Sequence, residues 1–249
     1  MRIVITGGAG FVGSSLCLGF KADGHEVHAF DNLKRRGSEL NLERFAKAGV
    51  KFVHGDVREP ADLAALPATF DLLIDASAEP SVLAGLDGSP AYLLDTNLKG
   101  TLHCLELARA RTKTVVFLST SRVYSIAPLR ALALDEGPTR FTARERPGID
   151  EAFPTSSPRS LYGATKLASE LFVQEYAATY GLKTVIDRCG VIAGAGQFGK
   201  VDQGFVALWA ASHVYGSPLE YRGFGGNGKQ VRDVLHPADL KRAIDLQLA

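Results

Sequence analysis

The chain has 249 residues, enough for one large α/β domain with a substantial hydrophobic core. Its formal net charge of +1 at pH 7 argues against a nucleic-acid or acidic-membrane partner, and no apolar run approaches the length of a membrane span. The three cysteines (Cys17, Cys104 and Cys189) are odd in number and widely spaced. We therefore expect reduced thiols in a cytoplasmic protein, with neither a disulfide framework nor a metal site.

The first 13 residues, MRIVITGGAGFVG, predict a strand, a glycine turn and the start of a helix. Residues 2–6 form a short, β-branched apolar run typical of a buried parallel strand, and 11–23 has a helical pattern. Gly7, Gly10 and Gly13 would allow a tight turn, the approach of the backbone to a pyrophosphate, and close packing of helix on strand. The free N–H groups and dipole at the helix start favour an anion. This pattern predicts a dinucleotide site.

An acidic residue ends the next predicted strand, 26–31. Asp31 follows the glycines by about 20 residues, where a carboxylate would bind the diol of the adenosine ribose. Because that carboxylate would repel a 2′-phosphate, we expect NAD and not NADP. Lys34, Arg35 and Arg36 keep the alternative open, since they could pair with such a phosphate, although a charge run of this kind is usually a solvated loop.

Strands and helices alternate through the rest of the chain, which predicts an α/β fold with a Rossmann-like, doubly wound parallel sheet. We expect further strands over 51–54, 72–75, 114–118 and 183–187. We expect further helices over 38–49, 60–66, 89–111, 157–180, 202–214 and 237–248. The Pro-, Gly-, Arg- and Glu-rich segment 125–156 predicts an irregular loop of the kind that often covers a substrate. The expected division is an NAD-binding domain over 1–187, including that insertion, and a partial substrate-binding region over 188–249.

Tyr162 and Lys166 carry the candidate chemistry, because they are four residues apart and share one face of a predicted helix. A neighbouring ammonium would lower the pKa of the phenol. Tyr162 could then take a proton from an alcohol while a hydride passes to a nicotinamide. The helix follows the strand that ends in Ser119, Thr120 and Ser121, at the edge where such sheets bind ligands. A hydroxyl there could orient a substrate alcohol, or it could only cap the strand.

Several motifs in fixed order resemble the extended short-chain dehydrogenase/reductase family, specifically its NAD-dependent epimerase/dehydratase group, which acts on nucleotide sugars. The matching stretches are TGGAGFVG (6–13), Asp31-Asn32, GDV (55–57), Asn97 with Gly100, STSRVY (119–124), YGATK (162–166) and VRDVLH (231–236). The stretches AEPSV (78–82), GKVDQG (199–204) and GNGKQVRDVLH (226–236), with the insertion 125–156, resemble the CDP-paratose 2-epimerase branch. The resemblance covers essentially the whole chain. Family members continue well past residue 249, so we expect the substrate-binding part to be truncated.

The resemblance implies a role for each matching residue. The catalytic group would be Thr120, Tyr162 as the base, and Lys166 as its partner. NAD would be held by Gly7, Gly10, Phe11, Val12, Gly13, Asp31, Asn32, Asp56, Val57, Ala76, Ala78, Asn97, Tyr162, Lys166 and Cys189. The substrate would be held by Glu79, Thr120, Lys200, Gln203 and, at its diphosphate, Arg232. Simpler interpretations stay open: a turn former for Asp56, a helix-turn cap for Asn97, and a surface pair with Asp233 for Arg232.

The resemblance implies an NAD-dependent epimerase that oxidises a nucleotide-linked sugar to a keto-sugar and reduces it again from the other face, with a CDP-hexose as the expected substrate. The alternatives are a UDP-sugar 4-epimerase, a nucleotide-sugar dehydratase or, in another class, a non-catalytic NAD-binding scaffold. Dehydratases of the family carry Asp-Glu after the catalytic threonine, where this chain has Ser121 and Arg122, and this disfavours dehydration. Ser125 replaces the usual glycine after Val-Tyr. We expect no nucleic-acid or membrane partner and a homodimer built on helices 89–111 and 158–180.

Overall fold

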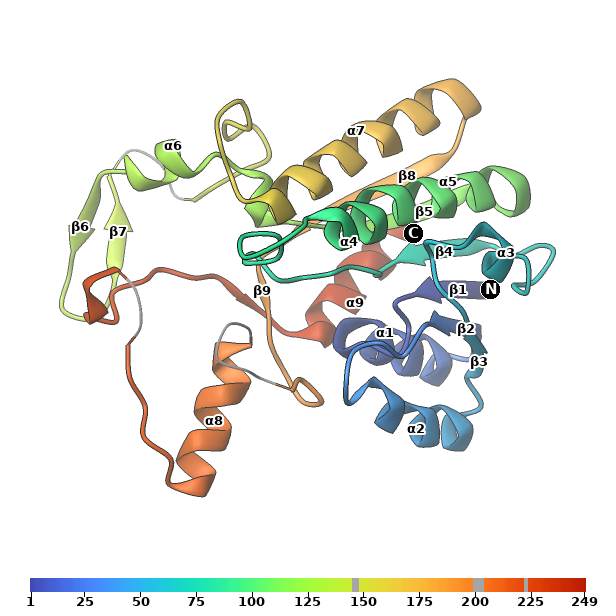
Figure 1. Cartoon of the computed structure of the whole chain (residues 1–249), viewed down its shortest axis with the longest axis horizontal. Coiled ribbons are helices and arrows are strands. Elements are labelled where there is room, and N and C mark those ends of the chain that lie inside the picture. The colour runs from blue at the N-terminus through green and yellow to red at the C-terminus, as the bar shows by residue number, and fades with distance from the viewer. Residues whose placement is uncertain (145–147, 199–203, 222–223) are drawn as a thin grey trace.

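A parallel six-stranded sheet forms the centre of the computed structural model, which describes residues 1–144, 148–198, 204–221 and 224–249 (Figure 1). The strand order is β3-β2-β1-β4-β5-β8. The strands are β1 (Arg2–Thr6), β2 (Glu26–Asp31), β3 (Lys51–His54), β4 (Leu72–Asp75), β5 (Thr114–Thr120) and β8 (Lys183–Cys189). The chain starts in the middle, runs out to one edge at β3 and returns to build the other half. The predicted doubly wound, Rossmann-like sheet is therefore confirmed.

Helices cover both faces of the sheet (Figure 1). One face carries α1 (Phe11–Ala22), α2 (Asn41–Ala48) and α9 (Pro237–Leu248), and the other carries α3 (Pro60–Leu63), α5 (Gly100–Arg111) and α7 (Leu161–Tyr180). Side chains of β1 alternate between the two layers: Ile3 and Ile5 pack with the first set, and Val4 packs with the second. This burial on both faces explains why the strand is a continuous apolar run.

Among the predicted helices that differ in the structure, two bear on the site; others are 38–49, which begins with a 3-10 turn at Ser38–Leu40, and 60–66, which ends at Leu63. The helix expected over 89–111 consists of α4 (Ala91–Leu94), a π-helical turn at Asp95–Lys99 and α5. The helix expected from residue 157 begins at Leu161, because the Ser160 hydroxyl accepts a hydrogen bond from the Gly163 N–H at 3.1 Å and caps the helix there. Both differences bear on the site, since the π turn carries the buried Asn97 and the cap precedes Tyr162.

The segment 125–156 contains regular structure that the sequence did not predict. It holds the short helix α6 (Ile126–Arg130) and an antiparallel hairpin of β6 (Leu134–Glu136) and β7 (Phe141–Ala143), which projects away from the sheet (Figure 1). Its ends meet at the fully buried Ser125, whose N–H donates to the Pro154 carbonyl at 2.9 Å and whose hydroxyl bonds both the N–H and the carbonyl of Ser157. The serine in place of glycine therefore closes the base of the insertion.

The last part of the chain buries fewer side chains than the central sheet and its helices do. β9 (Val191–Ile192) and β10 (Val234–Leu235) form a two-stranded parallel sheet. The helix α8 (Phe205–Tyr215) stands away from the central sheet with only Ser212 buried (Figure 1). α9 returns to the core beside α1, where Leu240 and Ile244 are buried. The division at residue 187 stays a prediction. Within the described residues, no helix is both long and apolar enough to cross a membrane.

Candidate active site

The glycine turn between β1 and α1 depends on contacts that only glycine allows. Gly7 has φ +63°, and a Cβ at this position would lie 2.6 Å from the Ala76 carbonyl oxygen. A Cβ on Gly13 would lie 2.1 Å from the Gly7 carbonyl oxygen. The first turn of α1 is thus pressed against the strand end, as the sequence predicts for a dinucleotide-binding turn.

This turn presents unsatisfied backbone donors to a cavity of about 1250 Å³. Within the described part of the chain, the N–H groups of Phe11, Val12 and Gly13 have no hydrogen-bond acceptor. All three residues, together with Gly7 and Gly10, line the cavity. Free N–H groups at the positive end of a helix dipole fit a pyrophosphate. These residues therefore suit the cofactor that the sequence predicts.

The Asp31 carboxylate is held at the end of β2 by backbone donors. Its oxygens accept hydrogen bonds from the N–H of Ala9 at 3.1 Å and the N–H of Leu33 at 2.7 Å. Burial raises the pKa of Asp31. The carboxylate is thereby fixed beside the glycine turn, where the ribose contact is expected.

Asn32, Asp56 and Arg58 form a polar cluster next to this position. The Asn32 amide donates to Asp56 at 2.8 Å, and the Arg58 guanidinium pairs with the same carboxylate at 2.6 Å. Hydrogen bonds from Arg58 hold the pKa of Asp56 well below its usual range. Asp56 is therefore more than a turn former, since it fixes the side chain of Asn32.

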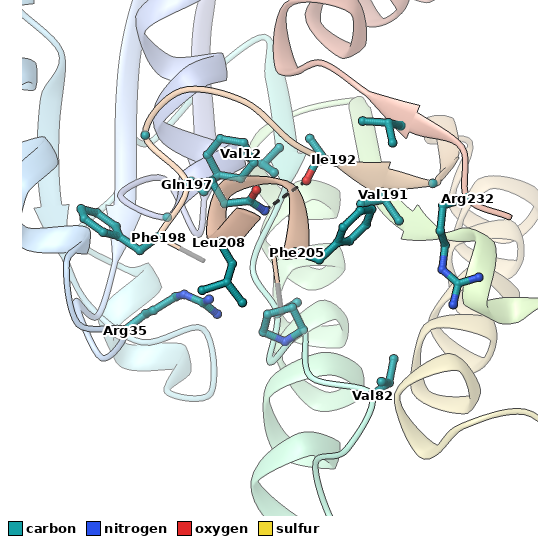
Figure 2. A pocket seen from close by; sticks show the side chains of 18 of the residues that line it. Val12, Arg35, Val82, Val191, Ile192, Gln197, Phe198, Phe205, Leu208 and Arg232 are labelled. Atoms are coloured by element: carbon teal, nitrogen blue, oxygen red, sulfur yellow. Dashed lines mark hydrogen bonds between the residues drawn. The ribbon is translucent and has the colours of Figure 1, made fainter. Parts of the chain in front are cut away.

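The basic run after β2 divides between two environments. The Lys34 ammonium lies 3.3 Å from the centroid of the Tyr92 ring. Arg35 and Arg36 line the cavity instead, and Figure 2 shows Arg35 on the side opposite Arg232. Only the two arginines therefore face the space near the glycine turn.

Asn97 supports the cavity wall from behind. It is fully buried, its amide oxygen accepts the Glu79 N–H at 2.7 Å, and its amide nitrogen donates to the Glu79 carbonyl at 3.1 Å and the Thr165 hydroxyl at 3.2 Å. It thus ties the segment after β4, whose Ala76 and Ala78 line the cavity, to α7. Asn97 itself is not among the residues that line the described cavity. The same is true of seven other predicted site residues: Asp31, Asn32, Asp56, Val57, Glu79, Thr120 and Cys189.

Thr120, Tyr162 and Lys166 come together at the carboxyl end of β5. Tyr162 and Lys166 line the cavity, and the Thr120 hydroxyl lies beside the Tyr162 phenol. The Lys166 ammonium is buried, donates to the Leu118 carbonyl at 2.9 Å and lies 4.5 Å from the centroid of the Phe117 ring. Tyr162 and Lys166 therefore line the same cavity as the glycine turn, and Thr120 lies next to Tyr162.

One prediction about this group is wrong. We expected Lys166 to lower the pKa of Tyr162, but burial raises the pKa of the phenol, opposed by the Thr120 hydroxyl and the charge of Arg122. The reason is geometric: the ammonium is directed to the Leu118 carbonyl at the sheet edge, and its own pKa is lowered by burial.

The predicted substrate residues are less closely grouped. Arg232 lines the cavity, donates to the Gln230 amide oxygen at 2.7 Å and has a pKa lowered by burial and by Arg122 (Figure 2). Its guanidinium makes no ion pair with Asp233, or with any other described acid. The Glu79 carboxylate accepts the Ser81 N–H at 3.1 Å. Lys200 and Gln203 lie outside the described residues.

Sequence reasoning missed a buried network beside the catalytic strand. Glu170 pairs with Arg188 at 2.7 Å and with the Ser119 hydroxyl, and Arg188 donates to the Glu151 carbonyl of the insertion at 3.0 Å. Glu170 lies four residues after Lys166 on the same helix face, which is the one signal that could have revealed it. The network fixes the strand end that carries Thr120.

Aromatic side chains on and near α8 were also missed. Phe205, Trp209 and Tyr221 all line the cavity. The Trp209 ring centroid lies 6.4 Å from that of Phe205 and 5.5 Å from that of Tyr221. Phe205 lies with Val191 and Leu208 on the cavity wall in Figure 2. The aromatic side chains form an apolar part of the cavity wall.

Comparison with known proteins gives consistent matches over the whole chain. The model of the NAD dependent epimerase/dehydratase family matches residues 3–249. The CDP-paratose 2-epimerase of Salmonella typhi is 34% identical over 248 residues, covering 96% of this chain and 72% of that protein. A dTDP-glucose 4,6-dehydratase of Streptomyces niveus is 31% identical, covering 100% of this chain and 69% of that protein. The structure of Thermus thermophilus UDP-glucose 4-epimerase in complex with NAD superposes with a TM-score of 0.76 at 29% identity, covering 100% of this chain and 74% of that chain.

Proposed function

Because the chain belongs to the NAD-dependent epimerase/dehydratase family, we propose that it is an enzyme that uses NAD to epimerise a nucleotide-linked sugar, in the manner of a CDP-paratose 2-epimerase. The cofactor is NAD, in keeping with the family and with the NAD complexes among its structural relatives. The finer assignment, to C2 of a CDP-hexose, is supported by the similarity to the Salmonella typhi enzyme.

The observation that carries the proposal is the position of Tyr162. Its phenol lies beside the Thr120 hydroxyl, in the same cavity as the free N–H groups of the glycine turn. The N–H groups of the turn would hold the pyrophosphate of NAD, and Tyr162 and Lys166 would face its nicotinamide end. A proton acceptor would then face the hydroxyl oxygen, and a hydride acceptor would face the carbon that bears it.

In this proposal, Tyr162 takes the proton of the sugar hydroxyl and Thr120 orients that hydroxyl by a hydrogen bond. Bound NAD supplies the hydride acceptor in the first half of the reaction and the hydride donor in the second. The cavity lets the keto-sugar turn over, and Tyr162 returns the proton to the oxygen after hydride addition to the other face. Lys166, whose ammonium is directed to the Leu118 carbonyl, would hold the nicotinamide ribose.

Arg122 and Ser121 favour epimerisation over dehydration. Elimination of water from a keto-sugar needs one group to remove a proton next to the ketone and one to protonate the departing hydroxyl. At neutral pH a guanidinium cannot accept a proton and a serine hydroxyl does not donate one readily. A UDP-sugar 4-epimerase needs only the same three catalytic groups, so it is separated by substrate alone.

We also propose a homodimer and a reducing compartment. Leu171 and Phe172 of α7 are 57% and 41% exposed, and α7 packs beside α5 (Figure 1), so two such helix pairs could bury them. All three cysteines are free and buried, as in a cytoplasmic protein. Sedimentation of the purified protein tests the dimer, and a monomer at micromolar concentration would refute it.

The test of function begins with the nucleotides that copurify with the protein, which should include NAD. The protein should then convert CDP-paratose, with Tyr162→Phe lowering kcat by about 10³-fold while NAD stays bound. Tyr176→Phe is the matched control, because that phenol lies on the same helix and donates to Glu106 at 2.5 Å. Turnover of UDP-sugars but not of CDP-paratose would refute the substrate assignment, and full activity of Tyr162→Phe would refute the mechanism.

A further inference from the structure

The hairpin of β6 and β7 is bound, near its turn, to a distant part of the chain. The Glu136 carboxylate at the end of β6 pairs with the Lys229 ammonium at 2.5 Å, although the two residues are 93 positions apart in sequence. Lys229 follows the 3-10 turn Phe224–Gly226, and Figure 1 shows this segment beside the tip of the hairpin. The insertion therefore contacts the last part of the chain, in addition to being fastened at Ser125.

The segment that contains Lys229 forms part of the cavity wall. Gly228, Gln230 and Arg232 line the cavity, whereas Lys229 is not among the residues that line it. The Arg232 guanidinium donates to the Gln230 amide oxygen at 2.7 Å. The ion pair with Glu136 therefore joins this wall at a residue outside the cavity lining, between residues that belong to the lining.

Packing contributes little to the position of this segment. Each residue from 225 to 234 is exposed, and 228–233 have no regular secondary structure. At one end, the Gly228 backbone lies against the Tyr221 ring, where a Cβ would come within 2.8 Å. At the other end, β10 begins to pair with β9 at Val234. Where few buried contacts hold a segment, one exposed ion pair changes how much of the time the segment spends in a single position.

The base of the insertion is fixed to the end of the catalytic strand. The Tyr124 ring, which follows the 3-10 turn after β5, packs edge-to-face on the Phe153 ring with centroids 5.8 Å apart, and both rings are buried. The Glu151 carbonyl accepts a hydrogen bond from Arg188 at 3.0 Å. The insertion thus runs from the strand end that carries the proposed catalytic hydroxyl to the segment that Glu136 holds.

We propose that Glu136 is a positioning residue for the substrate diphosphate: its ion pair with Lys229 holds the segment 227–232 so that the Arg232 guanidinium faces the cavity. The inference rests on the proposed role of Arg232 in binding that diphosphate. It gives the insertion 125–156 a function in substrate binding that needs no contact between hairpin and substrate. Without the ion pair, the segment would have to be ordered during binding, so the nucleotide would bind more weakly.

The sign of the effect separates this role from a direct effect of charge. A carboxylate repels a diphosphate, so loss of the Glu136 charge alone would strengthen nucleotide binding. The positioning role predicts the opposite result, because Glu136→Gln also releases Lys229 and with it the segment that carries Arg232. Weaker binding after removal of a negative charge is therefore the result that identifies positioning.

Calorimetric titration of CDP into the NAD-bound protein tests the inference without turnover. We expect Kd to rise about two- to fivefold in Glu136→Gln and in Lys229→Gln, and no further in the double variant. The charge-swapped variant Glu136→Lys/Lys229→Glu should restore the original Kd. Arg232→Gln should weaken binding by itself, and adding Glu136→Gln to it should change Kd no further.

Asp135→Asn is the matched control, because this acid precedes Glu136 on the same strand and forms an equally exposed ion pair with Arg144 inside the hairpin. It should leave Kd unchanged. An unchanged or lowered Kd in Glu136→Gln would overturn the inference, and so would a charge swap that does not restore binding.

Trypsin cleavage after Lys229 and Arg232, with NAD alone bound, gives a second measurement that needs no substrate nucleotide. Cleavage should become faster in Glu136→Gln and not in Asp135→Asn, and equal rates in all three proteins would overturn the inference. If the unmodified protein binds UDP but not CDP, the substrate assignment alone is refuted and the comparison of Kd values is made with UDP. Binding of neither nucleotide would refute the proposed function on which the inference rests.

Discussion

The two ends of the cavity are built in opposite ways. At the cofactor end, the backbone makes the surface: Gly7 and Gly13 lie in contact, and the free N–H groups belong to the first turn of a helix whose inner face is buried. At the substrate end, side chains of α8 and the β10 region make the surface, and most of them are exposed. A backbone surface recognises what all members of a family bind, whereas a side-chain surface can change from one member to the next. The relatives match this contrast, since epimerases and dehydratases of different nucleotide sugars resemble the chain to similar degrees.

The largest effect of a substitution is expected at the glycine turn, where Gly13 lies against the backbone of Gly7. In Gly13→Val, the new side chain meets the Gly7 carbonyl oxygen, to which even a Cβ would approach within 2.1 Å. We expect a loss of about 3 kcal/mol or more of unfolding free energy and no copurified NAD. Denaturant unfolding and nucleotide release measure both. Gly88→Ala is the control, because a Cβ there meets nothing within 4 Å. Equal stability of the two variants would contradict the view that the cofactor end is a closely packed backbone surface.

The second largest effect is expected at the Glu170–Arg188 ion pair, which lies between the two ends of the cavity. Arg188→Met leaves the Glu170 carboxylate buried without its partner, and we expect a loss of about 3 kcal/mol in denaturant unfolding. The insertion also loses its bond to Arg188, so proteolysis within 125–156 should become faster. Arg109→Met removes an exposed pair with Glu106 and should change stability little. If both variants unfold at the same denaturant concentration, the buried network does not hold the site.

A smaller effect is expected for one catalytic hydroxyl. Thr120→Val keeps the shape of the side chain but cannot orient a sugar hydroxyl, so kcat should fall about 10²-fold with copurified NAD unchanged. Steady-state kinetics with CDP-paratose measure the fall. Thr142→Val on the exposed strand β7 is the control. If Thr120→Val turns over as fast as the unmodified protein, the Thr120 hydroxyl does not orient the sugar hydroxyl.

The smallest effect is expected at the aromatic wall. Trp209→Ala removes a ring that lines the cavity beside Phe205 and Tyr221, and we expect KM for the sugar nucleotide to rise about tenfold with little change in thermal stability. Tyr215→Ala on the same helix, 81% exposed, should change neither quantity. A large loss of stability in Trp209→Ala would show that the substrate end is packed as firmly as the cofactor end.

The features that the sequence predicts correctly depend on short stretches of chain. The strand Arg2–Thr6, the glycine spacing and Asp31 at a strand end are local patterns with one physical interpretation each. The doubly wound parallel sheet follows from the alternation of strands and helices. Even the start of α7 was missed by only a few residues, because Ser157-Pro158 and Ser160 are both acceptable helix starts and the capping hydrogen bond of Ser160 decides between them.

The features that the sequence does not predict depend on contacts between distant segments. The direction of the Tyr162 pKa follows from burial by other elements and from the orientation of Lys166, neither of which is visible in a four-residue spacing. The sequence places Asn97 in the cofactor site but does not reveal its partners, which are the Glu79 backbone and the Thr165 hydroxyl. The Glu170–Arg188 pair joins residues of two elements whose proximity only the fold reveals.

The closure at Ser125 has a consequence for how such enzymes can diversify. Because both ends of the 125–156 segment are fastened at one buried hydroxyl, its hairpin can be lengthened, shortened or exchanged by recombination without altering the path of the strands on either side. A graft of the corresponding segment from another family member, joined at Ser125 and Ser157, should therefore leave the central sheet unchanged.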